Sequence, residues 1–532
     1  MGDRPPRSRD PSEGTRTSCS SGGNGSLVNT TITRNSAPID TARDLLDGAL
    51  RVYRKEPSIR AELEGHRRRL DEPLRVALVG SVKAGKSTLL NALLSEHLAP
   101  TDARECTRVV TWYRHGATPK VEAFELTGGV TGLPVVRQQE RLELDLGELG
   151  AESLDRLEVV WPAEQLNDLI LIDTPGTASI SSEVSSRTQQ FLAPQDGVSG
   201  VDAVVYMLRS LHTSDIDFLH HLHARTSHGA SALGSIAVLS RADELGGGRL
   251  DAMVSVNQAV KVLRAEPALT GLVEAVVPVA GLLALASSTL RQSEYAAFVA
   301  LEEVPRETLQ SLLVSADRFI STEDETLPSV RVRARLVERF GLYGIRLAVA
   351  TLRSGVTDAT MLSEELVRRS GLDELRSTLD IHFRQRSQEL KAHSAVLAVH
   401  RALSRQPRAE GRLLLETAEE YLNNSHAFRE MRLISRVRSV DLAMEESALA
   451  ELTQLIGGNG TTPHQRLGLD EDASPDELYD AAHEALWRWL DLVGNPLTER
   501  EVAAACRVVV RSCEGIIDRL TEPTWTAAET PV

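Results

Sequence analysis

The sequence has few cysteines, no long apolar run and fewer basic than acidic residues. Its 532 residues include four cysteines, too few for a disulfide framework. The longest apolar run, near residues 275–286, is shorter than the roughly 20 residues that span a bilayer, and it contains Pro278. The first 38 residues lack the apolar core of a signal peptide. We therefore expect a cytoplasmic protein, and peripheral contact with the inner face of the plasma membrane is the one membrane association left open.

The net charge argues against one class of partner. The chain carries 59 Lys plus Arg against 75 Asp plus Glu, so its formal net charge is −16. Binding to nucleic acid needs a broad positive field, so we expect no nucleic-acid partner. The content of hydrophobic (42%) and charged (25%) residues is ordinary for a globular protein, and the chain is long enough to bury a large core.

Lysine is the scarcest of the charged residues. The sequence contains six lysines against 53 arginines, yet two of the six, Lys83 and Lys86, lie in the single stretch GSVKAGKST (80–88). The apolar segment LRVALVG before this stretch indicates a strand, and STLLNALLSEHL, which begins inside it, indicates a helix. A glycine-rich turn between a strand and a helix is a typical site for phosphate groups.

The stretch fits the phosphate-binding pattern G-x-x-x-x-G-K-[ST]. Backbone N–H groups of such a loop point at phosphate oxygens, and the N-terminus of the following helix adds positive potential. We expect Lys86 to reach the β- and γ-phosphates of a nucleotide and the Ser87 hydroxyl to coordinate Mg²⁺. The alternative is a degenerate, empty loop. The predicted nucleotide-binding residues of this loop are Gly80, Ser81, Val82, Lys83, Ala84, Gly85, Lys86, Ser87 and Thr88.

A second motif, LILIDTPG (169–176), ends another predicted buried strand. Asp173 can hold the metal ion through a water molecule, and the N–H of Gly176 can donate to the γ-phosphate. This D-x-x-G pattern after a phosphate loop is typical of GTPases, whereas ATPases of other classes more often carry an acidic pair there. The alternative is an ordinary Asp-Pro-Gly turn.

A third segment, VLSRADE, indicates which base is bound. Its Ser240, Arg241 and Asp243 occupy positions of the GTPase pattern [NT]-K-x-D. The Asp243 carboxylate can accept hydrogen bonds from two guanine donors that adenine does not offer, and the Arg241 stem can cover the face of the base. We expect Ala280 and Gly281, at the end of the last predicted strand, to support guanine.

Thr107 is the predicted residue of the first switch. It lies in ECTRVVT (105–111), where its hydroxyl can ligate Mg²⁺ and its carbonyl can hold the attacking water. Thr101 and Thr111 are the alternatives. The residues that follow the D-x-x-G motif are Thr-Ala-Ser, so the glutamine that orients water in Ras-like enzymes is missing. Hydrolysis is therefore either very slow or assisted by another group.

Apolar segments that predict strands alternate with helical segments up to about residue 286, and only helical patterns follow. This order favours an α/β P-loop GTPase domain, in which a mostly parallel sheet carries helices on both faces. The predicted strands are 74–80, 108–114, 120–126, 157–161, 169–173, 202–208, 235–240 and 274–280.

Together these motifs resemble those of the dynamin superfamily of large GTPases. The segments GSVKAGKSTLLNALL, CTRVVTWYR, LILIDTPG and VLSRADELGGGR look most like the actinobacterial isoniazid-inducible dynamin-like proteins, and the resemblance covers about residues 40–400. It implies hydrolysis of GTP to GDP with Mg²⁺, a homodimer through the G domains, and membrane remodelling or maintenance with a second dynamin-like protein as partner. A soluble regulatory switch or scaffold without membrane contact is the alternative.

The resemblance also implies an α-helical neck bundle built from N- and C-terminal segments. The stretch after the G domain is long enough for a neck and a short stalk, but short for a long trunk with a membrane-inserting tip. The predicted domains are a disordered tail at 1–38, the N-terminal helix of the neck at 39–72, the G domain at 73–390, a helical bundle at 391–525 and a disordered tail at 526–532.

Lys83 stands where dynamin-type loops usually carry serine, at a position where the family binds a monovalent cation. Its ammonium can act as a tethered cation that offsets charge developing between the β- and γ-phosphates. The alternatives are a side chain in solvent or one that pairs with an acid across a G-domain dimer. The predicted catalytic residues are Lys86, Thr107 and Lys83. The predicted metal ligands are Ser87, Thr107 and, through water, Asp173.

Overall fold

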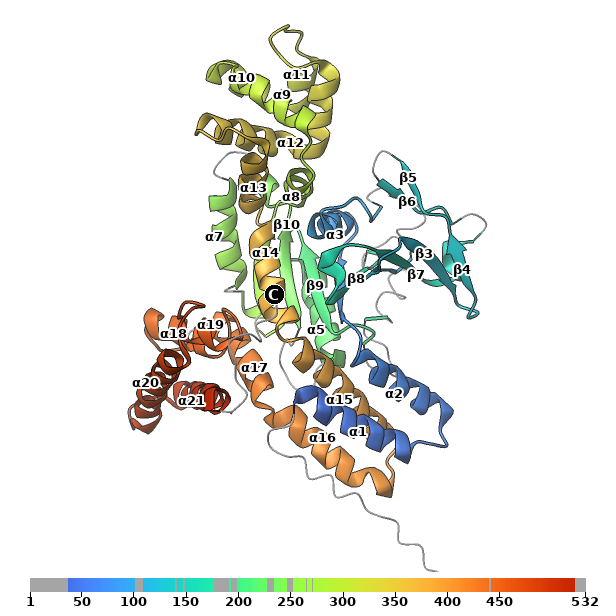
Figure 1. Ribbon diagram of the computed structural model, residues 1–532, viewed down its shortest axis with the longest axis vertical. Helices are drawn as coiled ribbons and strands as arrows, with labels where there is room; N and C mark the ends of the chain where they lie inside the picture. The colour runs from blue at the N-terminus through green and yellow to red at the C-terminus, as the bar shows by residue number, and fades with distance from the viewer. Residues whose placement is uncertain are drawn as a thin grey trace, which may run out of the picture. The chain divides into compact units, whose positions relative to one another are not determined.

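The structure, a computed structural model, contains one large sheet flanked by helices (Figure 1). All eight predicted strands belong to this sheet, and the predicted α/β fold class is confirmed. No helix among the described residues is long and apolar enough to cross a membrane. The structure describes residues 37–100, 109–138, 141–146, 149–176, 191–192, 199–226, 234–245, 252–264, 266–269, 271–439 and 442–521.

The sheet has nine strands in the order β11-β10-β9-β1-β8-β2-β7-β3-β4. Neighbours from β11 to β8 are parallel, as are β2 and β7, whereas the pairs β2–β8, β3–β7 and β3–β4 are antiparallel. The strands are β1 (Leu74–Gly80), β2 (Thr111–His115), β3 (Lys120–Glu125), β4 (Val130–Leu133), β7 (Leu154–Trp161), β8 (Leu169–Asp173), β9 (Ala203–Leu208), β10 (Ser235–Ser240) and β11 (Ala275–Val279).

Three strands were not predicted. They are β4 and a separate antiparallel pair formed by β5 (Val136–Gln138) and β6 (Arg141–Glu143). Each is only three or four residues long and is mostly exposed, so none has the apolar run or the clear alternation on which a prediction depends. The parallel strands β9, β10 and β11 are buried along their whole length, which is why their apolar runs were easily recognised.

The helices account for most of the remaining chain. Their bounds are α1 (Pro38–Val52), α2 (Pro57–Arg69), α3 (Lys86–Leu94), α5 (Thr213–Thr226), α6 (Ala242–Leu245), α7 (Ala252–Arg264), α8 (Gly281–Ser288), α9 (Gln292–Glu302), α10 (Arg306–Leu312), α11 (Ala316–Ser321), α12 (Val330–Arg353), α13 (Ala359–Arg369), α14 (Leu372–Leu379), α15 (Ser387–Arg405), α16 (Arg412–Asn424), α17 (His426–Ser439), α18 (Glu446–Leu455), α19 (Pro463–Leu467), α20 (Pro475–Gly494) and α21 (Arg500–Thr521).

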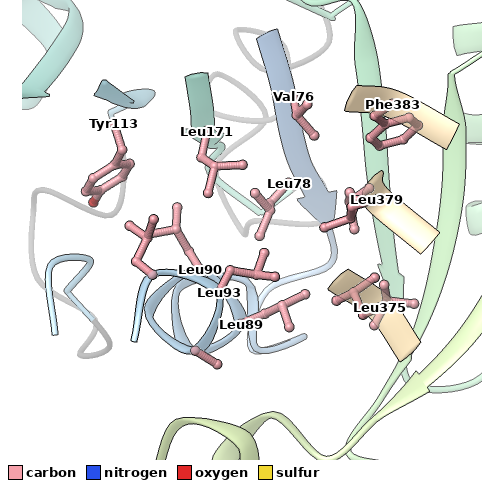
Figure 2. Close-up of a cluster of buried hydrophobic side chains, with 14 of the residues drawn as sticks. Val76, Leu78, Leu89, Leu90, Leu93, Tyr113, Leu171, Leu375, Leu379 and Phe383 are labelled. Carbon is pink, nitrogen blue, oxygen red and sulfur yellow. The ribbon is translucent and has the colours of Figure 1, made fainter. Parts of the chain in front are cut away.

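Both faces of the sheet are covered, because successive side chains of a strand point to opposite sides. On one face, Val76 and Leu78 of β1 pack with leucines of α3 and α14 (Figure 2). On the other face, Ala77 and Val79 share a core with α5 and α7. The central strand therefore has an apolar core on each side, and the loop that follows it is held between a buried strand and a buried helix.

Helices from the N-terminal segment and from a later segment, residues 387–424, form one bundle, as the predicted fold class requires. Side chains of α1, α2, α15 and α16 share a continuous apolar core. The Tyr53 hydroxyl donates to the carbonyls of Ala402, at 3.0 Å, and of Gln406, at 2.5 Å, and so joins the two segments. The N-terminal part of the bundle consists of two helices rather than the single predicted one, because Pro57 begins α2.

Two further helical units have cores of their own. Helices α9 to α12 pack with α8 and α13, so a helical unit lies inside the segment predicted as the G domain. Helices α17 to α21 form a C-terminal unit. Cys506 and Cys513 are both buried in its core, among apolar residues. Burial raises the pKa of Cys513 to about 12, so this thiol stays protonated at neutral pH.

Candidate functional site

The predicted phosphate loop joins β1 to α3 and has a strained backbone. Gly80, Lys83 and Gly85 have φ values of 150°, 63° and 93°. A Cβ atom at Gly80 would lie 2.3 Å from the carbonyl oxygen of Met207, so only glycine fits there. Lys83 is the one non-glycine residue of this loop at positive φ, a conformation that costs about 1–2 kcal/mol for a residue with a side chain.

Lys86 lies inside this loop rather than in solvent. Its ammonium donates to the carbonyls of Gly80, at 3.0 Å, and Ser81, at 3.1 Å. Burial lowers the pKa of Lys86, and the nearby Asp173 carboxylate partly opposes that shift. A cation held against the loop backbone is placed to meet an anion bound by the same loop.

Ser87 and Asp173 bring the first two motifs together. The parallel register of β1 and β8 sets Leu78 opposite Asp173, and the Ser87 hydroxyl donates to Asp173 Oδ2 at 2.7 Å. Burial raises the pKa of Asp173, an effect that Lys86 and Ser87 only reduce. The second oxygen, Oδ1, is buried and has no hydrogen-bond partner among the described residues.

This donor set fits a divalent cation. A buried carboxylate oxygen without a partner costs free energy unless something binds it. A hydroxyl beside a carboxylate supplies the hard oxygen ligands that Mg²⁺ prefers. The two residues are therefore suited to hold Mg²⁺. The Ser87 hydroxyl would ligate the ion directly, and the Asp173 carboxylate would do so either directly or through a water molecule.

Gly176 places the second motif against the phosphate loop. A Cβ atom at Gly176 would lie 2.5 Å from a methyl carbon of Val82 and 2.9 Å from its backbone nitrogen. The absence of a side chain thus allows the two backbones to approach closely. Thr174 supports this arrangement, because its buried hydroxyl donates to the carbonyl of Leu78 at 2.7 Å.

The predicted base-binding segment reaches the same loop from β10. The Ser240 hydroxyl donates to the Leu208 carbonyl at 3.1 Å and holds the end of this strand to β9. Arg241 has a positive φ of 54°, and its guanidinium donates to the carbonyl of Lys83 at 3.4 Å and to Glu244 at 2.8 Å. Burial raises the pKa of Asp243.

Ala280 and Gly281 lie at the start of α8, a helix that packs against α3. A Cβ atom at Gly281 would lie 3.9 Å from the Thr88 side chain, so the predicted base support adjoins the phosphate loop. The structure thus gathers three other predicted segments, 173–176, 240–243 and 280–281, around the loop 80–88. Thr107, the predicted switch residue, lies outside the described residues.

The Lys83 side chain is exposed at this site. Within the described residues it makes no hydrogen bond or ion pair, whereas its backbone carbonyl is held by Arg241. The ammonium is therefore free to turn toward a bound phosphate or toward solvent.

Sequence reasoning missed the support of the base-binding end. The Ala280 N–H donates to the carbonyl of Ser370 at 2.8 Å. Gly371, at φ 82°, lies so close to β11 that a Cβ atom there would be 2.1 Å from the Pro278 carbonyl. A glycine directly after a predicted helix indicates that the helix ends with a residue in the left-handed conformation. The sequence does not show which strand that glycine contacts.

Comparisons with known proteins agree with these motifs. A family model described as the dynamin family matches residues 76–239. The isoniazid-induced protein IniC of Mycobacterium tuberculosis is 42% identical over 484 residues, which are 90% of this chain and 98% of that protein. The isoniazid-induced protein IniA of the same organism is 32% identical over 142 residues, 25% of this chain and 22% of IniA.

Two shorter or weaker similarities accompany these. A bacterial dynamin-like protein of Nostoc punctiforme is 49% identical over 47 residues, 9% of this chain and 7% of that protein. A chain in a solved structure of an oligomerised bacterial dynamin pair aligns with this protein at 15% identity and a TM-score of 0.29. The alignment covers 90% of this chain and 79% of that chain. That score is too low to support an argument about fold or function.

Proposed function

The chain belongs to the dynamin family, and we propose that this bacterial GTPase couples GTP hydrolysis at the loop 80–88 to membrane remodelling or maintenance. The proposal includes dimerisation through the G domains, a second dynamin-like protein as partner, and a cytoplasmic location at the inner face of the plasma membrane. Its support is the family itself, together with a bundle in which the N-terminal helices α1 and α2 share one core with α15 and α16.

The observation that carries the proposed chemistry is the pair formed by Ser87 and Asp173. Their 2.7 Å hydrogen bond and the unpartnered Oδ1 oxygen are suited to Mg²⁺, which would neutralise charge on the β- and γ-phosphates. In this proposal the loop N–H groups and Lys86 bind the phosphates, and the N–H of Gly176 donates to the γ-phosphate. Thr107 keeps its predicted role of holding metal and water.

The base side is proposed to select guanine. An ionised, partly buried Asp243 accepts from the two guanine donors, and these bonds are stronger than neutral ones because the acceptor is charged. The Arg241 stem covers the base, while Ala280 and Gly281 close the pocket from α8.

Lys83 is proposed as the tethered cation of the reaction. It is one of six lysines, it projects from a loop residue held at positive φ, and its backbone is fixed by Arg241. A compact ammonium on a flexible stem suits this task better than the planar arginine fork that the chain otherwise uses. Its charge would replace an arginine finger or a bound monovalent cation.

GTP turnover in sodium, potassium and choline salts tests that role. We expect a wild-type rate that does not depend on the cation, and a slow Lys83→Ser variant that potassium partly restores. A wild type that itself requires potassium would contradict the tethered-cation proposal without affecting the rest of the site.

Liposome co-sedimentation separates the membrane function from its alternative, a soluble GTPase switch. The protein is incubated with GTP, with GDP or without nucleotide, each with and without a second dynamin-like protein from the same cell. GTP-dependent sedimentation in either setting supports the proposal. A protein that turns over GTP normally but never sediments with vesicles is a soluble switch or scaffold.

A further inference from the structure

Aromatic side chains gather on one exposed helix face, although the chain is poor in them. Phe, Tyr and Trp make up 4% of the sequence. Among the described residues, only Tyr479 (38%) and Trp487 (59%) are exposed aromatic side chains, and both belong to α20. Leu490, on the same helix, is also exposed. Burying large aromatic groups is a main source of binding energy at protein interfaces, so a solvated pair on one helix needs an explanation.

These side chains form a preordered stripe. The rings of Tyr479 and His483 stack at 5.6 Å, and those of His483 and Trp487 lie 6.0 Å apart. The Trp487 indole N–H donates to Nδ1 of His483 at 3.0 Å. Because the rings already hold one another, little side-chain freedom remains to be lost when a partner binds.

The stripe is distinct from the core face of the same helix. Four buried residues of α20 point into the C-terminal unit: Leu478, Ala482, Ala485 and Trp489. The spacing of Tyr479, His483, Trp487 and Leu490 places them on a different face, which covers about 16 Å along the helix axis. The exposed residues are therefore not needed to complete the core beneath them.

An acidic row runs beside the stripe. Residues 470–484 contain seven carboxylates and no lysine or arginine. Asp480 and Glu484 follow the aromatic positions by one residue, so they occupy the adjoining strip of the helix, and both are exposed. Arg488, the only Lys or Arg of α20, is already paired with Glu451 of α18.

We propose that this face, defined by Tyr479, His483, Trp487, Leu490, Asp480 and Glu484, binds a basic amphipathic helix of another protein. Apolar side chains of the partner would cover the aromatic stripe, and its Lys or Arg side chains would meet the acidic row. A helix of about three turns matches the length of the stripe. Complementary charge fixes the register and orientation of such a pair more than it adds affinity.

The acidic charge of this face argues against two other binding partners, an anionic membrane and a second copy of the chain. An anionic membrane would have to approach the exposed carboxylates of Asp480 and Glu484 beside the stripe, in a stretch without lysine or arginine, and like charges repel. A second copy would have to supply a basic, apolar helix, whereas α20 itself is acidic and cannot pair with its own symmetry mate through this face.

The test uses a fluorescein-labelled 18-residue peptide of Leu and Lys in an amphipathic helical pattern, followed by fluorescence anisotropy with the full chain. We expect saturable binding by the wild type. The pair Tyr479→Ser/Trp487→Ser and the pair Asp480→Lys/Glu484→Lys should each weaken binding at least about tenfold. Two control peptides, one of Leu and Glu and one of Ser and Lys, should bind weakly.

The matched control is Leu413→Ser/Glu420→Lys on α16. It removes an apolar residue that is at least as exposed as Tyr479 and Trp487, and it reverses an exposed carboxylate, on a helix that is not part of this face. It should bind the peptide like the wild type. Circular dichroism melting of all variants shows whether each remains folded.

Three outcomes would overturn the proposal. One is no saturable binding by the wild type, or an equal loss in the matched control. Another is Trp487-dependent binding to phosphatidylcholine or phosphatidylglycerol vesicles without peptide, which would make the face a membrane contact. The third is a concentration-dependent dimer that Trp487→Ser abolishes, which would make the occupant a second copy.

Discussion

The phosphate side and the base side of the site are built differently. On the phosphate side, Lys86, Ser87 and Asp173 contact one another or the loop directly, through short hydrogen bonds. On the base side, the predicted residues follow the ends of two strands, and their position depends on residues elsewhere, such as Ser370. Side-chain identity therefore sets the geometry of the proposed phosphate site, whereas long-range packing sets that of the proposed base pocket.

The largest effect is expected on the phosphate side, from Lys86→Ala. Removing the buried ammonium takes away the main cation facing the β- and γ-phosphates, so GTP turnover should fall by about 100-fold or more. Steady-state phosphate release at saturating GTP measures this. A variant with normal turnover would show that the reaction uses another site.

On the base side, Asp243→Asn should weaken GTP binding by about 10- to 100-fold, because two guanine donors lose a charged acceptor. Discrimination against other purine nucleotides should fall as well. Equilibrium binding of GTP, inosine triphosphate and ATP tests this, and an unchanged preference would remove Asp243 from base recognition. Burial raises the pKa of Asp243, so GTP affinity should decline on acidification at a higher pH than an exposed aspartate would allow.

Gly371→Ala tests whether packing positions the base pocket. A side chain at φ 82° is strained, and its Cβ would overlap the Pro278 carbonyl, so we expect a loss of about 1–3 kcal/mol in the free energy of unfolding and weaker GTP binding. Gly128→Ala is the matched control, because Gly128 has φ 92° but open space around it. Equal losses in unfolding free energy and equal GTP affinity in the two variants would refute the role of the Pro278 contact.

The smallest effect is expected from Arg241→Lys, which restores the lysine of the usual GTPase pattern. The aliphatic stem that covers the base remains, and the exposed pair with Glu244 is worth about 0–1 kcal/mol. GTP affinity should therefore change by less than about threefold. A much larger loss, measured by isothermal titration, would mean that the guanidinium contact with the Lys83 carbonyl holds the phosphate loop in shape.

The phosphate side was predictable because its signals are local. Gly80 and Gly85 have positive φ values, which residues with a side chain adopt only with strain. Asp173 follows a run of apolar residues that clearly predicts a buried strand. The parallel register of two such strands then brings Ser87 and Asp173 together without further information.

The rest depends on contacts between distant segments. Helical periodicity shows that α9 to α12 are helices, but not that they form a core separate from the sheet. Nothing in the residues around Ser370 indicates that its carbonyl accepts from Ala280, ninety positions earlier. The N-terminal segment was predicted as one helix, but it contains Pro57, and whether a proline ends a helix or begins one depends on the neighbouring fold.

The rate of nucleotide hydrolysis by the full chain, measured with GTP and with ATP during a Mg²⁺ titration, tests the central claim most directly. The account predicts saturable GTP turnover that requires Mg²⁺, a rate with ATP at least about tenfold lower, and loss of Mg²⁺-dependent turnover in Ser87→Ala. Equal rates with ATP, or GTP turnover that persists in excess chelator, would contradict it.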